Sequence, residues 1–210
     1  MKKALSLLLV GAMTLSLAAC GNSSSDSAET ESAATEESTT TEASDSEGSG
    51  EAVFKIGGIG PITGGTAIYG TAVQNGIQIA VDEINAAGGI NGYQIDYDFQ
   101  DDEGDSEKAI NAYNTLKDWG MQVLAGPVTT TPTLAVAAES VNDNMFVMTP
   151  SASAQTVIET GDNVFQICFT DPNQGVASAD YIAENALATK IGVIYDSSDA
   201  YSSGIYAKFK

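Results

Sequence analysis

The chain lacks arginine and histidine entirely, and all eight of its basic side chains are lysines among 210 residues. Without histidine there is no Ser-His-Asp or Cys-His catalytic arrangement and no histidine metal ligand. Without arginine there is no guanidinium fork to hold a phosphate or a base edge. Against these lysines stand 28 acidic residues, which give a net charge of −20. We therefore expect no nucleic-acid partner, because such binding depends on basic side chains.

Cysteine is almost as scarce, with only Cys20 and Cys168 present. Residues 1–19 have two lysines, then an apolar run and small residues, which is typical of a secretory leader and too short to span a bilayer comfortably. The end of this leader, Leu17-Ala18-Ala19-Cys20, resembles a bacterial lipobox, in which the cysteine sulfur is acylated and becomes the new N-terminus. We expect acyl chains on Cys20 to anchor the protein to a membrane. The alternative is an ordinary signal peptide with an incidental cysteine.

Residues 20–51 contain serine, threonine, alanine, glycine and acidic side chains, with no aromatic residue and no lysine. Such a segment cannot bury enough apolar surface to order itself. We predict a disordered tether between the lipid and the folded domain, and favour this over an acidic metal trap because gathering scattered carboxylates costs chain entropy.

From residue 52 onwards, predicted strands alternate with predicted amphipathic helices. Repeated strand-helix units of this kind predict an α/β fold with a doubly wound parallel sheet, whose ligands bind outside the carboxyl ends of the strands. We assign 52–170 to a first ligand-binding lobe. The expected strands are 53–59, 94–100, 122–125, 145–149 and 163–169. The expected helices are 71–87, a helix capped by Ser106 that ends at 119, and a helix from 132 onwards with an apolar face of Leu134, Ala135, Ala138 and Val141.

The loop 126–132 follows a short apolar strand and contains three consecutive threonines before Pro132. Proline suits the first helical position, where its missing N–H would be unpaired in any case. The unpaired N–H groups and the partial positive charge of a helix start, with threonine hydroxyls beside them, can hold a small carboxylate without a cationic side chain. The sequence therefore predicts a binding protein with no enzymatic activity, no cofactor and no metal.

Residues 171–210 are predicted to form a hinge and the start of a second lobe. Pro172 and Gly175 indicate the hinge, which precedes a helix to about 189, a strand at 191–195 and a helix starting near Ser202. One strand with two helices cannot form a sheet alone, so we expect this lobe, and hence the chain, to be truncated.

Several motifs in order and spacing resemble the substrate-binding lipoproteins of ABC importers for branched-chain amino acids, the Leu/Ile/Val-binding type of periplasmic binding protein. They are Ile59-Gly60-Pro61-Ile62-Thr63-Gly64, Tyr69-Gly70, residues 84–92 (INAAGGING), residues 126–130 (GPVTT), residues 149–153 (TPSAS) and residues 171–175 (DPNQG).

The resemblance implies a site and partners. Thr130 and Ser153 would hold the carboxylate of an amino-acid ligand, and the Ser151 carbonyl would receive its ammonium group. Tyr69 and Tyr201 would wall the pocket for its side chain. The partners would be a membrane permease and its ATPase, and the location would be extracytoplasmic, lipid-anchored to the bacterial cell membrane.

The chain departs from the family at three points. Gln166 stands where the family usually has arginine, and a disulfide of some members is impossible because Gly104 and Thr129 occupy its positions. An acid that the family's second lobe supplies for the ammonium group lies beyond the end of this chain. We expect Cys168 to be a buried strand residue rather than a reactive thiol.

Other interpretations of single motifs remain open. The Gly58-Ile59-Gly60 motif suggests a dinucleotide site, but Thr63 occupies the place of the third glycine. The acidic cluster at 101–105 could bind a metal, although a solvated strand end beside a helix N-terminus is preferred. The hydroxyls at the predicted site could be helix caps. Because fold alone does not fix function, a sensing domain recognising an amide or another small organic acid, or an enzyme domain, is the alternative.

Overall fold

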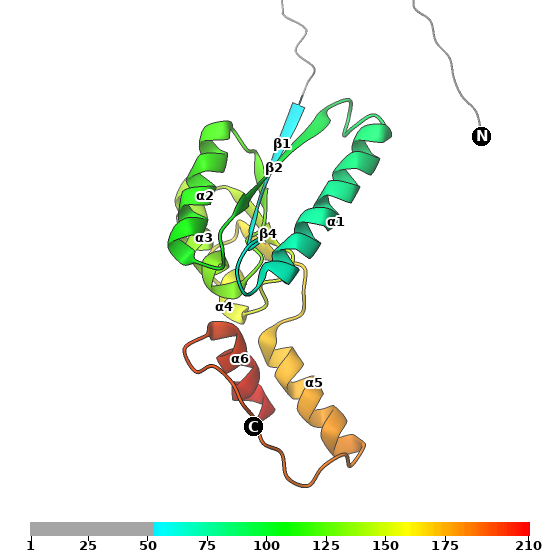
Figure 1. Cartoon of the computed structure of the whole chain (residues 1–210), viewed down its shortest axis with the longest axis vertical. Helices are drawn as coiled ribbons and strands as arrows, with labels where there is room; N and C mark the ends of the chain where they lie inside the picture. The colour runs from blue at the N-terminus through cyan, green and yellow to red at the C-terminus, as the bar shows by residue number, and fades with distance from the viewer. Residues whose placement is uncertain (1–52) are drawn as a thin grey trace, which may run out of the picture. The chain divides into compact units, whose positions relative to one another are not determined.

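The computed structural model describes residues 53–210 (Figure 1). The predicted leader at 1–19 and the predicted tether at 20–51, including the lipidation site Cys20, lie outside the described residues. Among the residues described, no helix is both long and apolar enough to cross a membrane.

Five parallel strands form one sheet in the order β2-β1-β3-β4-β5. This topology confirms the predicted α/β class and the doubly wound parallel sheet. The register aligns Gly57 of β1 with Leu124 of β3, and Leu124 with Val147 of β4. The strands are β1 Val53–Gly60, β2 Gln94–Asp101, β3 Val123–Ala125, β4 Phe146–Thr149 and β5 Val164–Gln166.

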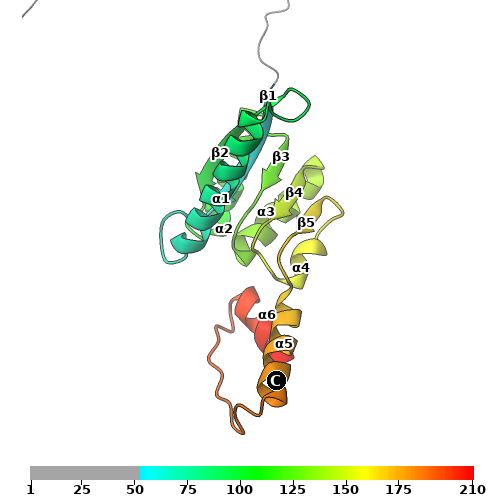
Figure 2. The ribbon, with the colours of Figure 1, turned by 90° about the vertical axis from the view of Figure 1, so that its right-hand side faces the viewer.

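Helices lie on both faces of this sheet. One face of β1 and β2 packs against α1, whereas α2 and α3 lie side by side on the other face (Figures 1 and 2). A short helix, α4, sits in the connection to β5, where the sequence predicted no element. The helices are α1 Ala67–Ala86, α2 Ser106–Trp119, α3 Thr130–Asp143, α4 Gln155–Ile158, α5 Asp171–Glu184 and α6 Ala200–Phe209.

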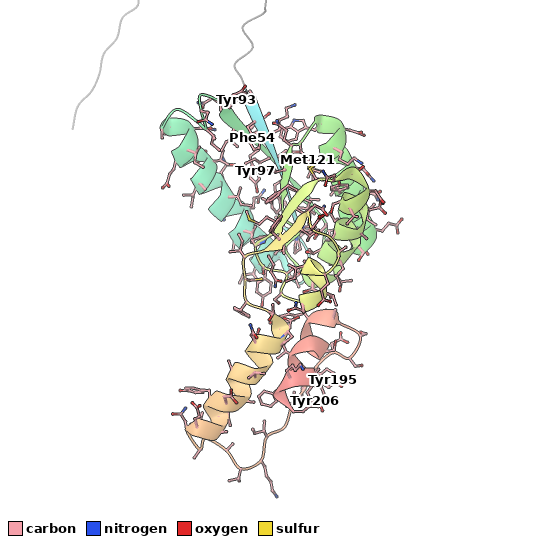
Figure 3. All side chains as sticks on the ribbon, turned by 180° about the vertical axis from the view of Figure 1, so that it is seen from behind. Phe54, Tyr93, Tyr97, Met121, Tyr195 and Tyr206 are labelled. Atoms are coloured by element: carbon pink, nitrogen blue, oxygen red, sulfur yellow. The ribbon has the colours of Figure 1, made fainter. Side chains whose placement is uncertain are left out.

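The glycines of β1 let side chains pack directly on the strand. An added Cβ at Gly57 would lie 2.7 Å from the sulfur of Met121, and one at Gly58 would lie 2.4 Å from the Phe99 ring. Because neighbouring strand residues point to opposite faces, Gly57 leaves room for a side chain on one face of the sheet and Gly58 leaves room on the other. Figure 3 labels Met121 beside the strands.

The main core lies between the sheet and the α2 and α3 helices, with Ile59, Leu124, Val147 and Val164 contributed by four strands. The predicted apolar face of α3 was wrong at Ala138 and Val141, which are exposed, whereas Leu134 is partly buried and packs against the core. Polar side chains share the buried face because their hydroxyls donate to backbone carbonyls within the helix or the preceding loop. The buried face of α3 consists of Thr130, Pro132, Thr133, Val136, Ala137 and Ser140.

Three helix starts differ from the prediction. The first helix starts four residues early, at Ala67, because Gly70 packs against the backbone of Pro61 and belongs to the helix. Proline is also tolerated later in a first turn, whose N–H groups have no helical partner, so α3 begins at Thr130 and not at Pro132. The cap of α2 is Asp105 and not Ser106, because the Asp105 carboxylate accepts from Glu107 N and Lys108 N, both at 2.9 Å.

The segment after β5 also differs from the prediction. The predicted hinge residues Pro172 and Gly175 lie inside α5, whose first residue is Asp171. An added Cβ at Gly175 would lie 2.4 Å from the Ile205 carbonyl oxygen, so the glycine lets α5 and α6 approach closely.

Residues 191–195 do not form the predicted strand. A strand needs a neighbour to satisfy its backbone groups, and none of the described strands pairs with this segment. Instead, the Tyr195 ring stacks on Tyr206 of α6 with 4.1 Å between ring centroids (Figure 3). The division of the chain into a lobe and the start of another at residue 171 remains a prediction.

Candidate ligand-binding pocket

A cavity of about 620 Å³ lies at the carboxyl ends of the strands. Its walls come from the loops that follow β1 to β5 and from the beginning of α6. This is the edge of a doubly wound sheet where ligands bind. Five residues that the sequence assigned to ligand binding all line this one cavity, namely Tyr69, Thr130, Ser151, Ser153 and Tyr201.

The N-terminus of α3 forms one wall of the pocket. Thr129 occupies the N-cap position, but its hydroxyl does not bond to the helix N–H groups. Within residues 53–210 that hydroxyl oxygen is buried without a hydrogen-bond partner. No side chain therefore caps α3. Pro132 has no N–H, and the Thr133 N–H donates to the Thr129 carbonyl at 3.0 Å. The Thr130 and Thr131 N–H groups of the first turn remain available to an anion in the pocket. Thr130, the first helical residue, is only 5% exposed.

Hydroxyl groups link the loop after β3 to the loop after β4. The Pro127 carbonyl accepts from Thr133 Oγ1 at 3.0 Å and from Thr149 Oγ1 at 2.7 Å. The Thr149 oxygen in turn accepts from the Ala152 N–H at 3.0 Å. One buried threonine at the end of β4 thus fixes the two loops that carry Thr130 and Ser153.

Thr149→Val should lower the free energy of unfolding by about 1–3 kcal/mol, because it leaves the Ala152 N–H unpaired and removes one donor from the Pro127 carbonyl. Urea unfolding followed by circular dichroism measures this loss. Thr131→Val is the matched control, because Thr131 is exposed and its change should stay within about 0.5 kcal/mol. Equal stabilities for the two variants would show that the Thr149 hydroxyl does not hold the loops together.

Ser153 is 3% exposed, and its hydroxyl donates to Asp171 Oδ1 at 2.6 Å. A serine hydroxyl carries one proton, so in this arrangement the Ser153 oxygen can only accept from a ligand. That geometry does not suit the carboxylate contact predicted for Ser153, but it suits an ammonium group. Burial raises the pKa of Asp171, the Ser153 hydrogen bond lowers it, and the negative charge of Asp199 raises it again.

Tyr69 and Tyr201 form the open side of the cavity. Tyr69 is 59% exposed in the first turn of α1, and Tyr201 is 43% exposed at the start of α6. The structure brings both rings to the pocket from segments far apart in the sequence.

Sequence reasoning missed Asp199, which also lines the pocket. Its carboxylate caps α6 by accepting from Ser202 N at 2.9 Å. The pattern of an acid before a helix start signals such a cap, but only the fold shows that the cap faces a cavity. Asp199 thus places an acid at the pocket within this chain, whereas the acid that the family resemblance implied for an ammonium group was expected in a later part of the second lobe.

Cys168 was predicted to be a buried strand residue, but it lies beyond the end of β5 and is only partly buried. Its thiol faces the Ala152 carbonyl with 3.4 Å between sulfur and oxygen, and the residue lines the pocket.

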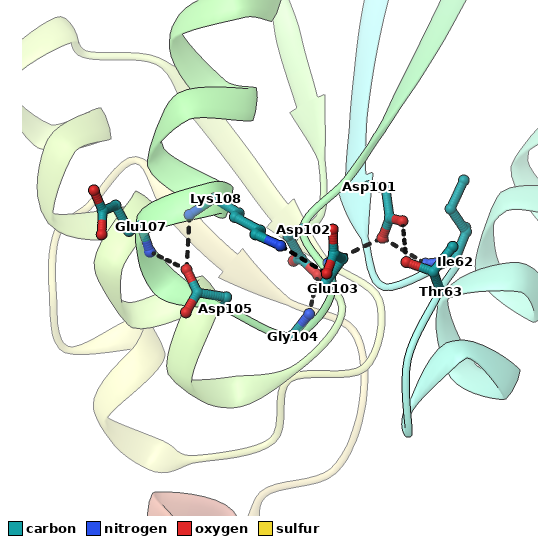
Figure 4. Close-up of polar contacts among 9 residues, drawn as sticks. All are labelled: Ile62, Thr63, Asp101, Asp102, Glu103, Gly104, Asp105, Glu107 and Lys108. Carbon is teal, nitrogen blue, oxygen red and sulfur yellow. Dashed lines mark hydrogen bonds and ion pairs between the residues drawn. The ribbon is translucent and has the colours of Figure 1, made fainter.

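The acidic cluster at the end of β2 forms hydrogen bonds that fix the neighbouring loops (Figure 4). Asp101 accepts from Ile62 N at 2.9 Å and from Thr63 Oγ1 at 2.5 Å, so it fixes the loop that follows β1. Asp102 is fully buried and accepts from Gly104 N at 2.8 Å. In the described part of the chain, no group of three or more potential metal ligands is gathered.

The fold, with its five-stranded parallel sheet flanked by helices, is that of a type I periplasmic binding protein. Residues 53–210 match the sequence profile of the family described as periplasmic binding protein, and the chain belongs to this family. The Leu/Ile/Val-binding protein BraC3 of Rhizobium johnstonii is 34% identical to this chain over 161 residues, which is 76% of this chain and 44% of the relative. The chain therefore spans less than half the length of this relative.

Solved structures agree with this assignment. The substrate-binding protein LivJ of the branched-chain amino acid transporter of Streptococcus pneumoniae, solved with isoleucine, shares 34% identity and a TM-score of 0.72, covering 75% of this chain and 45% of LivJ. The leucine-binding protein LivK of Thermotoga maritima gives 29% identity and a TM-score of 0.69, covering 75% of this chain and 44% of LivK. All three relatives are named as binding proteins and not as enzymes.

Proposed function

We propose that the chain is an extracytoplasmic substrate-binding component of an ABC importer and that it binds a branched-chain or similar amino acid. The observation that carries this proposal is the uncapped N-terminus of α3 at the pocket, beside the buried Thr130. A helix start without a side-chain cap can hold a carboxylate through its N–H groups. The names of the relatives, which bind leucine, isoleucine or valine, support the same ligand class.

The carboxylate, the ammonium group and the side chain of an amino acid would each contact a different part of the pocket. The carboxylate would lie at the α3 N-terminus and accept from the Thr130 hydroxyl. The ammonium group would donate to the Ser151 carbonyl, to the Ser153 hydroxyl oxygen and towards Asp199. The side chain would lie between Tyr69 and Tyr201.

The same proposal covers partners and location. Membership of the family supports delivery to a permease and its ATPase, and acyl chains on Cys20 would keep the protein at the membrane that contains the permease. Residues 171–210 would form a hinge and the beginning of a second lobe that closes on the ligand.

Thr130→Val tests the carboxylate contact. Valine keeps the shape of threonine and removes the hydroxyl, so leucine affinity should fall by about 1–3 kcal/mol if the hydroxyl pairs a charged carboxylate. Calorimetry with leucine, isoleucine and valine measures the change, and Thr115→Val, on the exposed face of α2, is the control that should leave it unaltered.

Three results would count against the proposal. Unchanged affinity in Thr130→Val would place the carboxylate elsewhere in the pocket. Binding of a urea-like amide or an aromatic acid, with no binding of amino acids, would favour the sensing alternative. A kinase gene beside this one, in place of permease and ATPase genes, would point the same way.

A further inference from the structure

Asp171 is a buried carboxyl group that the proposed ligand contacts do not use. It is 0% exposed, and its backbone N–H donates to the Ser153 carbonyl at 2.9 Å while its side chain accepts from the Ser153 hydroxyl. These two bonds join the first residue of α5 to a residue of the pocket wall. Asp171 itself lines a separate cavity of about 310 Å³, so it stands behind Ser153 as seen from the pocket.

The second oxygen of this carboxyl group has no hydrogen-bond partner among residues 53–210. It lies 3.2 Å from the position that a Cβ on Gly204 of α6 would occupy, so a glycine leaves it room without supplying a donor. The charged group that influences the pKa of Asp171 is another acid, Asp199, and it raises this pKa. A buried negative charge with one hydrogen bond is costly, and a nearby positive charge would offset that cost.

We propose that Asp171 is a positioning residue for the ammonium group of the ligand. By taking the only proton of Ser153, it makes the Ser153 oxygen an acceptor towards the pocket, and it supplies negative charge directly behind that oxygen. A ligand ammonium that donates to Ser153 completes a chain of hydrogen bonds ending at a carboxylate, which strengthens each bond in it. This inference rests on the proposed function, and it adds a residue that selects amino acids over the corresponding acids that lack the amine.

The test compares leucine with 4-methylpentanoate, which has the same carbon skeleton and carboxylate but no ammonium group. Asp171→Asn keeps an oxygen that can accept from Ser153 and removes the charge. This variant should weaken leucine binding about tenfold or more, because the hydrogen bond from the leucine ammonium group to Ser153 loses the negative charge behind it. It should change 4-methylpentanoate binding less than about twofold, because that compound has no ammonium group. Asp180→Asn, an exposed acid on the same helix, is the control and should affect neither compound. Equal weakening of both compounds by Asp171→Asn would show a merely structural role and overturn the inference.

A second measurement does not need a ligand. Carbon-13 NMR of the Asp171 carboxyl group should give a higher pKa in Ser153→Ala than in the wild type. In the wild type the Ser153 hydroxyl stabilises the charged carboxylate by donating a hydrogen bond to it, and the variant lacks this bond. A pKa of Asp171 that this substitution leaves unchanged would overturn the inference whatever the binding result. A wild-type chain that binds neither leucine nor 4-methylpentanoate would instead count against the proposed function.

Discussion

Gly70→Ala is expected to lower the free energy of unfolding by on the order of 3 kcal/mol, at the upper end for an overpacked site. An added Cβ at Gly70 would lie 1.9 Å from the Pro61 carbonyl oxygen and 2.5 Å from its carbonyl carbon. Both atoms belong to the backbone, so no side-chain rotation relieves the contact. The first turn of α1 would have to move away from the loop that follows β1.

Gly76→Ala provides the matched control on the same helix. An added Cβ there meets nothing within 4 Å, so this variant should gain about 0.5–1 kcal/mol from helix propensity. Thermal and urea unfolding of both variants give the comparison. Tyr69 precedes Gly70, so leucine affinity should fall in Gly70→Ala and stay constant in Gly76→Ala. If Gly70→Ala were as stable as the wild type, the close packing of α1 on Pro61 would be wrong.

Asp102 should make the protein less stable as the pH rises through about 6. Burial raises the pKa of Asp102 from 3.8 to about 6, the Gly104 N–H bond lowers it, and the charge of Asp101 adds to the increase. The folded state therefore holds this proton more tightly than the unfolded state. The contribution of Asp102 to the free energy of unfolding is fully present below its ordinary pKa of 3.8 and is lost as the pH rises through the raised pKa of about 6. A pKa difference of about two units corresponds to a total of about 3 kcal/mol.

Asp102→Asn isolates that contribution, because asparagine does not titrate and can still accept from Gly104. Between about pH 3 and pH 8 the wild type should lose about 3 kcal/mol more unfolding free energy than the variant. Asp171, whose pKa is also raised, is common to both proteins and cancels in the difference. Urea unfolding across this range supplies the measurement, and parallel pH profiles would contradict the buried, protonated Asp102.

The sheet could be predicted from the sequence because its strands are short apolar runs or, in β2, alternating polar and apolar residues, and because amphipathic helices separate them. The order of those runs is enough to specify parallel pairing. Helix starts were less predictable, since the start of α1 depends on a contact between Gly70 and Pro61 that local sequence does not encode. The buried face of α3 was missed because Thr133 and Ser140 look polar until their hydroxyls are seen bonded to backbone carbonyls.

The pocket could be predicted in part for a topological reason. Carboxyl ends of parallel strands meet at one edge, so the hydroxyl-rich loops after β3 and β4 had to converge. Asp199 and Asp171 could not be predicted as parts of the site region, because their positions depend on how α5 and α6 pack after the last strand. The bond from Ser153 to Asp171 spans 18 residues of sequence, with no local pattern to signal it.

The Pro127 carbonyl, which accepts from Thr133 and Thr149, also affects how a ligand would be bound. Because folding already fixes the two loops, little further conformational entropy has to be lost when a small molecule arrives. The preorganised loops after β3 and β4 favour one arrangement of the carboxylate and ammonium groups of a ligand and adapt poorly to other arrangements. Variation in the ligand side chain would then be accommodated by the rings of Tyr69 and Tyr201, which are exposed at the open side of the pocket.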